Sequence, residues 1–129
     1  MAEMKLAVVG AGGRMGRMLI QAVATEPQTV LVGATERSDS PHLGQDAGTL
    51  AGAGPLGVAI GSDPAAALAG AEGILDFTAP VLSAELAGLA ARRGLVHVVG
   101  TTGLGPGEFA ALRAASTGAR IVQSGNMSL

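Results

Sequence analysis

The sequence predicts an α/β fold, a single domain with a doubly wound parallel sheet. Three observations lead to this prediction. Short apolar runs alternate with helix-like segments along all 129 residues, a pattern that places helices on both faces of a parallel sheet. Hydrophobic residues make up 48% of the chain, enough for a buried core in one domain of this length. The chain also has 21 Gly, so we expect backbones to pack closely.

Six runs predict the strands. The first, residues 4–9 (MKLAVV), is short, mostly apolar and followed by glycines. Such a run is typical of a buried parallel strand, and we expect it to be the central one. The run at 57–60 gives the weakest signal. The remaining strands are predicted at residues 30–36, 73–77, 96–99 and 120–123.

The segments between the strands predict helices. Apolar residues recur at helical spacing over residues 14–24 and 80–93, and the second segment ends in two arginines and a glycine that can cap it. Residues 106–117 predict a third helix. Ser62-Asp63-Pro64 is typical of a helix start, with a capping side chain and a proline in the first turn. Residues 37–54 predict a loop with one short helical turn.

Composition excludes several classes of function. The chain has no Cys and two His, which excludes disulfides, thiolate chemistry and a His-rich metal centre. A net charge of −2 and two aromatic residues, both Phe, argue against nucleic acid as a partner, since its binding uses basic grooves and aromatic stacking. No stretch is long and apolar enough for a membrane span, and the N-terminus lacks signal-peptide features. We therefore expect a cytoplasmic protein.

A glycine-rich segment joins the first predicted strand to the first predicted helix, with the order Gly10, Ala11, Gly12, Gly13, Arg14, Met15 and Gly16. Glycines let backbone N–H groups approach a pyrophosphate, and the helix N-terminus adds partial positive charge there. The spacing is G-x-x-G-x-x-G rather than strict G-x-G-x-x-G. A glycine cluster alone is often an ordinary turn, but this position between strand and helix favours a Rossmann-type dinucleotide site.

The second signal is Glu36, which closes the second predicted strand about 20 positions after Gly16. Its carboxylate can accept hydrogen bonds from both adenosine ribose hydroxyls, which favours NAD. The adjacent Arg37 can meet the 2′-phosphate of NADP. The pair therefore predicts that both NADH and NADPH are used. As alternatives, Glu36 can be a solvated strand end and Arg37 an ordinary surface residue.

Phe77 lies where the strand at 73–77 ends, at the ligand-bearing edge of the sheet. Its ring can pack beside the nicotinamide or its ribose, or it can be a buried aromatic in a chain short of large side chains. The sequence leaves both alternatives open. Asp76 can belong to the N-cap region of the next helix and need not be catalytic.

Two further loops follow strands at the same edge. The first contains Gly100, Thr101, Thr102 and Gly103, whose amides and hydroxyls can orient a carboxamide or a substrate carboxylate. The second contains Ser124, Gly125, Asn126 and Met127, of which Asn126 offers a carboxamide both a donor and an acceptor. Each loop is a weak signal alone, and their shared position at strand ends makes them candidates.

No residue in the sequence stands out as a catalytic acid, base or nucleophile. His97 alternates within a predicted strand, which favours a structural histidine. His42 lies in a loop near no recognisable partner. We therefore name no catalytic residue and no metal ligand.

Six segments together resemble the dihydrodipicolinate reductases, also called 4-hydroxy-tetrahydrodipicolinate reductases, of bacterial lysine and diaminopimelate synthesis. A generic Rossmann domain would share only the first segment, whereas these occur in the family's order and span nearly the whole chain. They are VVGAGGRMGR, ATERSDS, DAGTLAGAG, DFTAP, VVGTTGL and SGNMSL.

The resemblance implies roles for individual residues. Residues 10–15 would bind the pyrophosphate, and Glu36 with Arg37 the adenosine ribose or its phosphate. Phe77 and residues 100–102 would line the nicotinamide end of the cofactor.

The same resemblance implies that residues 124–127 would close over the nicotinamide end, while Thr102 and Gly103 would border the substrate. One departure is visible, because Ser124-Gly125 stands where the family often has Ala-Pro or Ala-Ala before the Asn. Backbone contacts should survive that change.

The resemblance also implies a longer protein. Family members continue into a second domain that binds a cyclic dicarboxylic acid, donates the proton and forms a tetramer. None of its segments is present here, so we expect residues 1–129 to be the NAD(P)-binding domain of an oxidoreductase. We expect this chain to bind NADH or NADPH without turnover, and the intact enzyme to be a homo-oligomer with a small-molecule substrate.

Two rival functions remain open at this point. A non-catalytic module that senses NAD(H) would also lack an acid and a base, but it does not explain the DFTAP, GTTG and SGNMSL segments. The cofactor domain of another two-domain oxidoreductase is the second rival.

Overall fold

Within the residues that the computed structural model describes, which are 4–78, 80–99 and 120–123, a five-stranded sheet forms in the order β2-β1-β3-β4-β5. Each strand runs parallel to its neighbours. The predicted α/β fold with a parallel sheet is thereby confirmed. The strands are β1 (Met4–Val9), β2 (Thr29–Thr35), β3 (Gly73–Asp76), β4 (Val96–Val99) and β5 (Arg120–Gln123).

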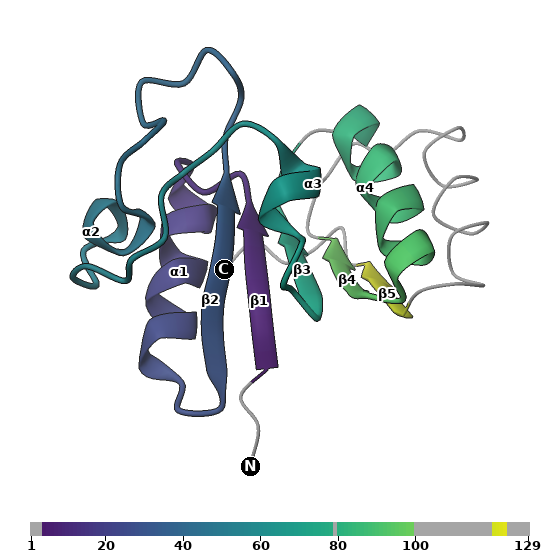
Figure 1. Ribbon diagram of the computed structural model, residues 1–129, viewed down its shortest axis with the longest axis horizontal. Coiled ribbons are helices and arrows are strands. Elements are labelled where there is room, and N and C mark those ends of the chain that lie inside the picture. Colours follow the sequence, from purple (N-terminus) through teal and green to yellow (C-terminus); the bar gives the residue numbers. More distant parts are fainter. Residues whose placement is uncertain (1–3, 79, 100–119, 124–129) are drawn as a thin grey trace.

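Helices cover both faces of this sheet (Figure 1). The side chains of β1 alternate between the two faces and so contribute to two separate cores. Leu6 and Val8 belong to a core with buried residues of α1 and α2. Ala7 and Val9 belong to a second core with buried residues of α4. The sheet is therefore doubly wound, as predicted. The helices are α1 (Arg14–Thr25), α2 (Ala47–Ala51), α3 (Pro64–Ala67) and α4 (Pro80–Arg93).

The strand predicted at 57–60 does not form, and that prediction was wrong. Within this segment only Ala59 makes an isolated bridge, to Asp46, and Gly61 just after it makes another, to Thr35. The physical reason is that the backbone amides of residues 56–58 donate to the Asp46 carboxylate instead of to a neighbouring strand. Because no strand among the described residues lies beyond β2, β1 is an interior strand of this sheet but not the central one, a position that β3 takes.

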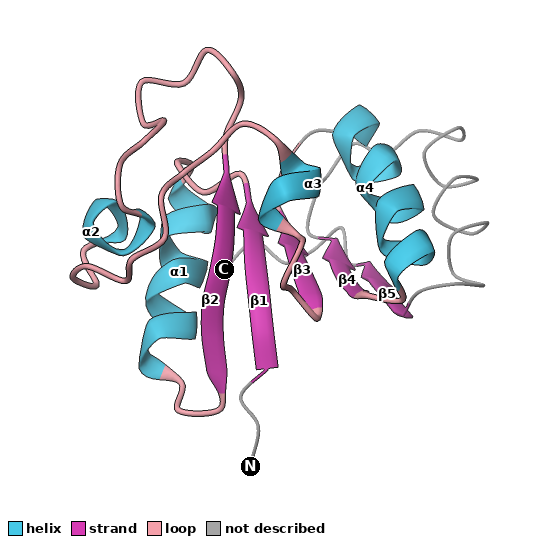
Figure 2. Ribbon diagram, viewed as in Figure 1, coloured by secondary structure: helices cyan, strands magenta, loops and turns pink. Residues whose placement is uncertain are grey.

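The predicted helices within the described residues agree with the structure in position. The helix at 80–93 has the predicted bounds, and α1 is one residue longer than predicted. α3 begins where predicted, with the Asp63 carboxylate accepting a hydrogen bond from the Ala65 amide at 3.1 Å, but it has only four residues. After β2, α2 lies between two long loops (Figure 2). It forms the short helical turn that was predicted within residues 37–54. The helix predicted at 106–117 lies outside the described residues.

The carboxyl ends of the strands form a single row. Val9 of β1 is in register with Thr35 of β2 and with Asp76 of β3. Asp76 is in register with Val99 of β4, which pairs with Gln123 of β5. The segments that follow the strands therefore start side by side along one edge of the sheet, where α/β domains bind ligands. No helix in the described part of the chain is long and apolar enough to cross a membrane.

Candidate functional site

The chain turns sharply between β1 and α1, and glycine is required twice in this turn. Gly10 has a φ of 92°, and a Cβ there would lie 2.8 Å from the Phe77 carbonyl oxygen. A Cβ on Gly16 would overlap the Gly10 carbonyl oxygen. The first glycine thus makes the turn, and the second lets α1 pack against it.

Most amides of this turn are already used within the protein. The Gly10 and Ala11 amides donate to the Thr35 carbonyl at 3.0 and 2.9 Å, and the Gly12 amide donates to Glu36. Gly13 is the N-cap of α1 and provides no side-chain cap. Because the first amides of a helix have no partner within it, the amides of Arg14 and Met15 are the donors placed for an anion.

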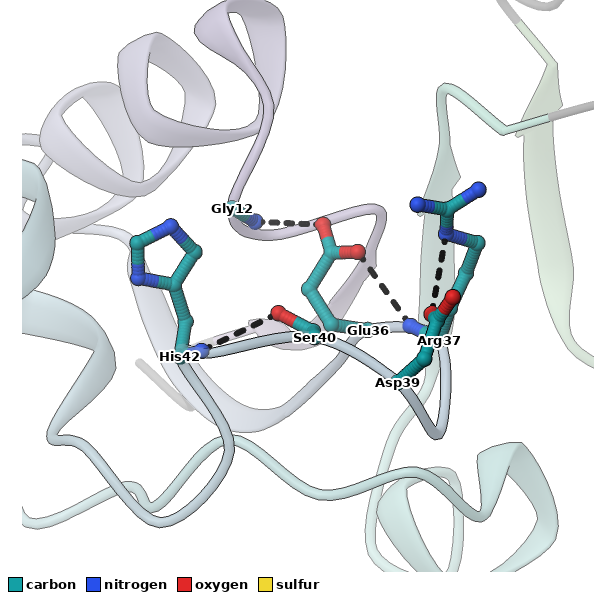
Figure 3. A network of polar contacts seen from close by, with 6 residues as sticks. All are labelled: Gly12, Glu36, Arg37, Asp39, Ser40 and His42. Carbon is teal, nitrogen blue, oxygen red and sulfur yellow. Dashed lines mark hydrogen bonds and ion pairs between the residues drawn. The ribbon is translucent and has the colours of Figure 1, made fainter.

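Glu36 lies directly against the glycine turn, as Figure 3 shows. Its Oε2 accepts a hydrogen bond from the Gly12 amide at 2.6 Å, and its Oε1 accepts one from the Arg37 amide at 3.2 Å. A Cβ on Gly12 would lie 3.1 Å from Glu36 Oε2. The predicted proximity of Glu36 to the glycines is confirmed, and a Cβ at position 12 would crowd the carboxylate.

The imidazole of His42 contacts the glycine turn, although its buried Nδ1 atom has no hydrogen-bond partner among the described residues. A Cβ on Gly12 would lie 2.9 Å from His42 Cδ2, so the imidazole packs on the glycine turn beside Glu36 (Figure 3). The loop that brings it there is held by the Ser40 hydroxyl, which accepts a hydrogen bond from the His42 amide at 3.1 Å. No sequence pattern pointed to this contact, since it depends on the path of the loop after β2.

Arg37 and Asp39 form an ion pair at the outer end of the same loop. The Arg37 Nε and Asp39 Oδ1 are 3.4 Å apart, and the side chains are 81% and 73% exposed. The Ser40 amide donates to the Arg37 carbonyl at 3.0 Å, which closes a tight turn around Asp39. The guanidinium therefore has a carboxylate beside it before any ligand arrives.

A cleft of about 380 Å³ opens at this edge of the sheet. It brings together five of the predicted site residues, namely Gly10, Gly13, Glu36, Arg37 and Phe77. The structure adds residues from the same edge that the sequence did not single out, which are Val9, Thr35, Ser62, Pro64, Thr78, Leu82 and Glu85. The starts of α3 and α4 supply several of these. The capping signal at the start of α3 was visible in the sequence, but which strand each helix start would adjoin was not.

Other predicted site residues lie elsewhere or outside the described residues. Ala11 is fully buried in the core, so only its backbone belongs to the turn. Arg14 lines a separate hollow of about 420 Å³ between α1 and α2, and neither Gly12 nor Met15 is among the residues that line the cleft. The predicted residues outside the described part are Gly100, Thr101, Thr102, Gly103, Ser124, Gly125, Asn126 and Met127.

Asp76 and His97 form a buried pair beneath the cleft. The Asp76 Oδ2 and His97 Nε2 atoms are 2.9 Å apart, and both side chains are fully buried. The other oxygen, Asp76 Oδ1, accepts a hydrogen bond from the Thr78 hydroxyl at 2.6 Å. His97 is thus a core residue, as expected from its position within a predicted strand. Asp76 ends β3, and its carboxylate contacts both His97 and Thr78 a few residues before α4 begins.

The space above the first turn of α1 fits a phosphate group. A Cβ on Gly13 would meet nothing closer than the Gly10 carbonyl oxygen, at 3.6 Å, and the first-turn amides face no capping side chain. A parallel sheet whose first strand turns through glycines into a helix, with a carboxylate after the second strand, defines the Rossmann class of nucleotide-binding domains.

Comparison with known proteins identifies the family. The family model "Dihydrodipicolinate reductase, N-terminus" matches residues 4–127, and the chain belongs to this family. A 4-hydroxy-tetrahydrodipicolinate reductase from Methylocella silvestris is 55% identical over the whole chain and 47% of its own length. One from Brucella abortus is 56% identical over 98% of this chain and 47% of its own. The chain thus spans about half the length of the curated relatives it matches.

Solved structures of low identity share the fold. The WlbA dehydrogenase from Thermus thermophilus, in complex with NAD and α-ketoglutarate, superposes with a TM-score of 0.68 at 18% identity, over 94% of this chain and 41% of that one. A myo-inositol dehydrogenase from Corynebacterium glutamicum superposes with a TM-score of 0.65, also at 18% identity, over 93% of this chain and 36% of that one. The Rossmann-type fold is therefore confirmed independently of close sequence similarity.

Proposed function

We propose that the cleft at the ends of β1, β2 and β3 binds a nicotinamide dinucleotide, and that the chain is the cofactor-binding domain of a 4-hydroxy-tetrahydrodipicolinate reductase. The observation that carries this proposal is the 2.6 Å hydrogen bond from the Gly12 amide to the Glu36 carboxylate. It joins the two parts of the dinucleotide signature in one place. Family membership supports the same conclusion.

The proposed contacts follow from the donors and acceptors in the cleft. The Arg14 and Met15 amides, above Gly13, hold the pyrophosphate, since they are the unpaired start of α1. Glu36 accepts the ribose hydroxyls, because a carboxylate has acceptor sites beyond the one that Gly12 occupies. Arg37 contacts the 2′-phosphate of NADPH. With Glu36 for the ribose and Arg37 for the phosphate, the site accepts both NADH and NADPH.

At the other end of the cleft, Phe77 packs against the nicotinamide half of the cofactor. Residues 100–102 and 124–127 complete this end, and Thr102 with Gly103 borders the substrate. When bound, the dinucleotide supplies a hydride. The part of this chain is to hold the cofactor, orient it and exclude water around it.

The intact protein, in this proposal, reduces 4-hydroxy-tetrahydrodipicolinate to tetrahydrodipicolinate in lysine and diaminopimelate synthesis, as a cytoplasmic homo-oligomer. These 129 residues bind the cofactor without turnover, and a second domain binds the dicarboxylate and donates the proton. Among the described residues that line the cleft, Arg37 is the single cation, and it lies on the adenosine side. A dicarboxylate substrate needs cations or helix N-termini at the opposite end.

Calorimetric titration of the chain with NADH and with NADPH tests cofactor binding. We expect saturable binding of both. Arg37→Ala should weaken NADPH binding by about 1.5–3 kcal/mol, the usual contribution of a charge-assisted hydrogen bond, and should change NADH binding much less. Equal effects on both cofactors would reject Arg37 as the phosphate contact. Binding of neither cofactor by the folded chain would reject the proposed function.

The absence of turnover has its own assay. The chain is mixed with NADH and enzymatically generated 4-hydroxy-tetrahydrodipicolinate, and the loss of NADH absorbance is followed. We expect no loss above the background rate. Turnover near that of an intact two-domain reductase would place catalysis within these 129 residues.

A further inference from the structure

The loop after β2 places a carboxylate beside the guanidinium that is proposed to contact a 2′-phosphate. Asp39 lies two residues after Arg37, and its Oδ1 is 3.4 Å from Arg37 Nε. Figure 3 shows this ion pair. Neither side chain takes part in the hydrogen bonds that the Glu36 carboxylate accepts from the Gly12 and Arg37 amides. Arg37 lines the cleft and Asp39 does not.

The fold keeps these two side chains close to each other. The hydrogen bond from the Ser40 amide to the Arg37 carbonyl closes a turn with Asp39 inside it, and the Ser40 hydroxyl in turn accepts from the His42 amide. His42 packs on Gly12, which anchors the loop to the glycine turn. Rotation of the exposed side chains can lengthen the ion pair, but it cannot carry Asp39 far from Arg37.

A carboxylate in this position acts against a phosphate in two ways. First, Asp39 occupies the Nε edge of the guanidinium, with its Oδ1 3.4 Å from Nε, and this is one of the edges that a phosphate would use for a bidentate contact. It also neutralises the positive charge of Arg37 and repels the negative charge of the phosphate. NADH has a hydroxyl at this position, so neither effect applies to it.

We propose that Asp39 is a cofactor-specificity residue that acts through Arg37 and biases the site towards NADH over NADPH. This inference rests on the proposed function, because it needs a dinucleotide in the cleft. It differs from the assignment of Arg37 in predicting that removal of a charge improves binding of one cofactor. Since both side chains are mostly exposed, we expect a change of about two- to fivefold, the size that exposed ion pairs produce.

The test is calorimetric titration of the full 129-residue chain with NADH and NADPH at low ionic strength. The variants are Asp39→Asn, Arg37→Ala, the double variant, and Glu26→Gln as a matched control. Glu26 is exposed, loses the same single charge and lies after α1, at the opposite end of β2 from Arg37. It therefore reports any general effect of net charge.

We expect Asp39→Asn to tighten NADPH binding about two- to fivefold, with a much smaller change for NADH and none for Glu26→Gln. The gain should shrink in the Arg37→Ala background and disappear near 1 M salt, where charges are screened within about 3 Å. An unchanged or weakened affinity for NADPH would overturn the inference, and so would an equal gain without Arg37. In those cases the proposed function stands, whereas a folded chain that binds neither cofactor rejects both.

Discussion

The Asp76 carboxylate and the His97 imidazole meet at 2.9 Å in the interior of the sheet, with neither side chain exposed to solvent. They lie on adjacent strands, and Asp76 also accepts a hydrogen bond from the hydroxyl of Thr78, which lines the cleft. The pair thus connects the core of β3 and β4 to one wall of the proposed cofactor site.

Replacement of His97 tests the contribution of this pair to stability. His97→Leu fills the same place in the core with an apolar side chain and removes the nitrogen that faces Asp76. We expect it to lower the free energy of unfolding by about 1–3 kcal/mol. His97→Gln, which retains a polar end, should lose less. Urea denaturation measures both. Equal losses for the two variants would show that packing, rather than the polar contact, is what His97 provides.

Glu36 links the glycine turn to the loop after β2, and its removal should affect the cofactor more than the fold. Glu36→Ala removes the acceptor for the Gly12 amide and the proposed acceptor for the ribose hydroxyls. We expect NADH affinity to fall by about tenfold or more, since hydrogen bonds to a charged group contribute roughly 1.5–3 kcal/mol. Glu36→Gln should fall in between. Fluorescence titration gives the dissociation constants, and an Ala variant with wild-type affinity would refute the ribose assignment.

Two glycines of the turn should respond differently to alanine. A Cβ on Gly13 meets only the Gly10 carbonyl oxygen, at 3.6 Å, whereas a Cβ on Gly16 overlaps that same oxygen. We expect Gly13→Ala to keep the melting temperature and to weaken dinucleotide binding, because the methyl group lies where the pyrophosphate is proposed. Gly16→Ala should lose about 1–3 kcal/mol of stability or more from overpacking.

Thermal denaturation followed by NADH titration separates these two effects. If Gly13→Ala bound NADH as tightly as the wild type, no pyrophosphate would approach the backbone at this position. If Gly16→Ala kept wild-type stability, the close packing of α1 on the turn would be wrong.

Asp46 makes stability depend on pH in the acid range. Hydrogen bonds from the backbone amides of Thr49, then Leu56, Val58 and Gly57, lower the pKa of Asp46 from 3.8 to about 2, against a smaller opposing effect of burial. A carboxylate whose pKa is lower in the folded state stabilises the fold above its unfolded pKa. This contribution should be present above about pH 4 and be lost as the pH falls towards 2.

Acid denaturation of the wild type and of Asp46→Asn measures this contribution. The Asn variant should be less stable near neutral pH, because its side chain accepts fewer of the amide hydrogen bonds. The difference between the two proteins should shrink between pH 4 and 2. A constant difference over that range would mean that the Asp46 charge has no part in holding the 46–58 loop.

Several features of the fold could be predicted because local patterns decide them. The bounds of α4 follow from apolar spacing and from the Arg92-Arg93-Gly94 ending, and β1 follows from an apolar run before glycines. Glu36 could be placed beside the glycine turn, because the carboxyl ends of adjacent parallel strands lie at the same edge. These signals involve few residues each and do not depend on long loops.

The rest depends on contacts between distant segments. The 57–60 run did not become a strand because Asp46, about ten residues earlier, takes up its amides. His42 reaches Gly12 only through the path of the 37–46 loop. Asp39 is an exposed side chain with no pattern around it, and its importance follows from its distance to Arg37. No periodicity or spacing in the sequence encodes these three relationships.

The most direct test of the central claim is a titration of the isotope-labelled chain with NADH, followed by amide chemical shifts in NMR. The account predicts saturable changes at the Gly12, Gly13, Arg14 and Met15 amides and at Glu36, Arg37 and Phe77, with little change at the amino end of β2. Saturable changes confined to the hollow between α1 and α2, or no changes at NADH concentrations that saturate ordinary dehydrogenases, would contradict it.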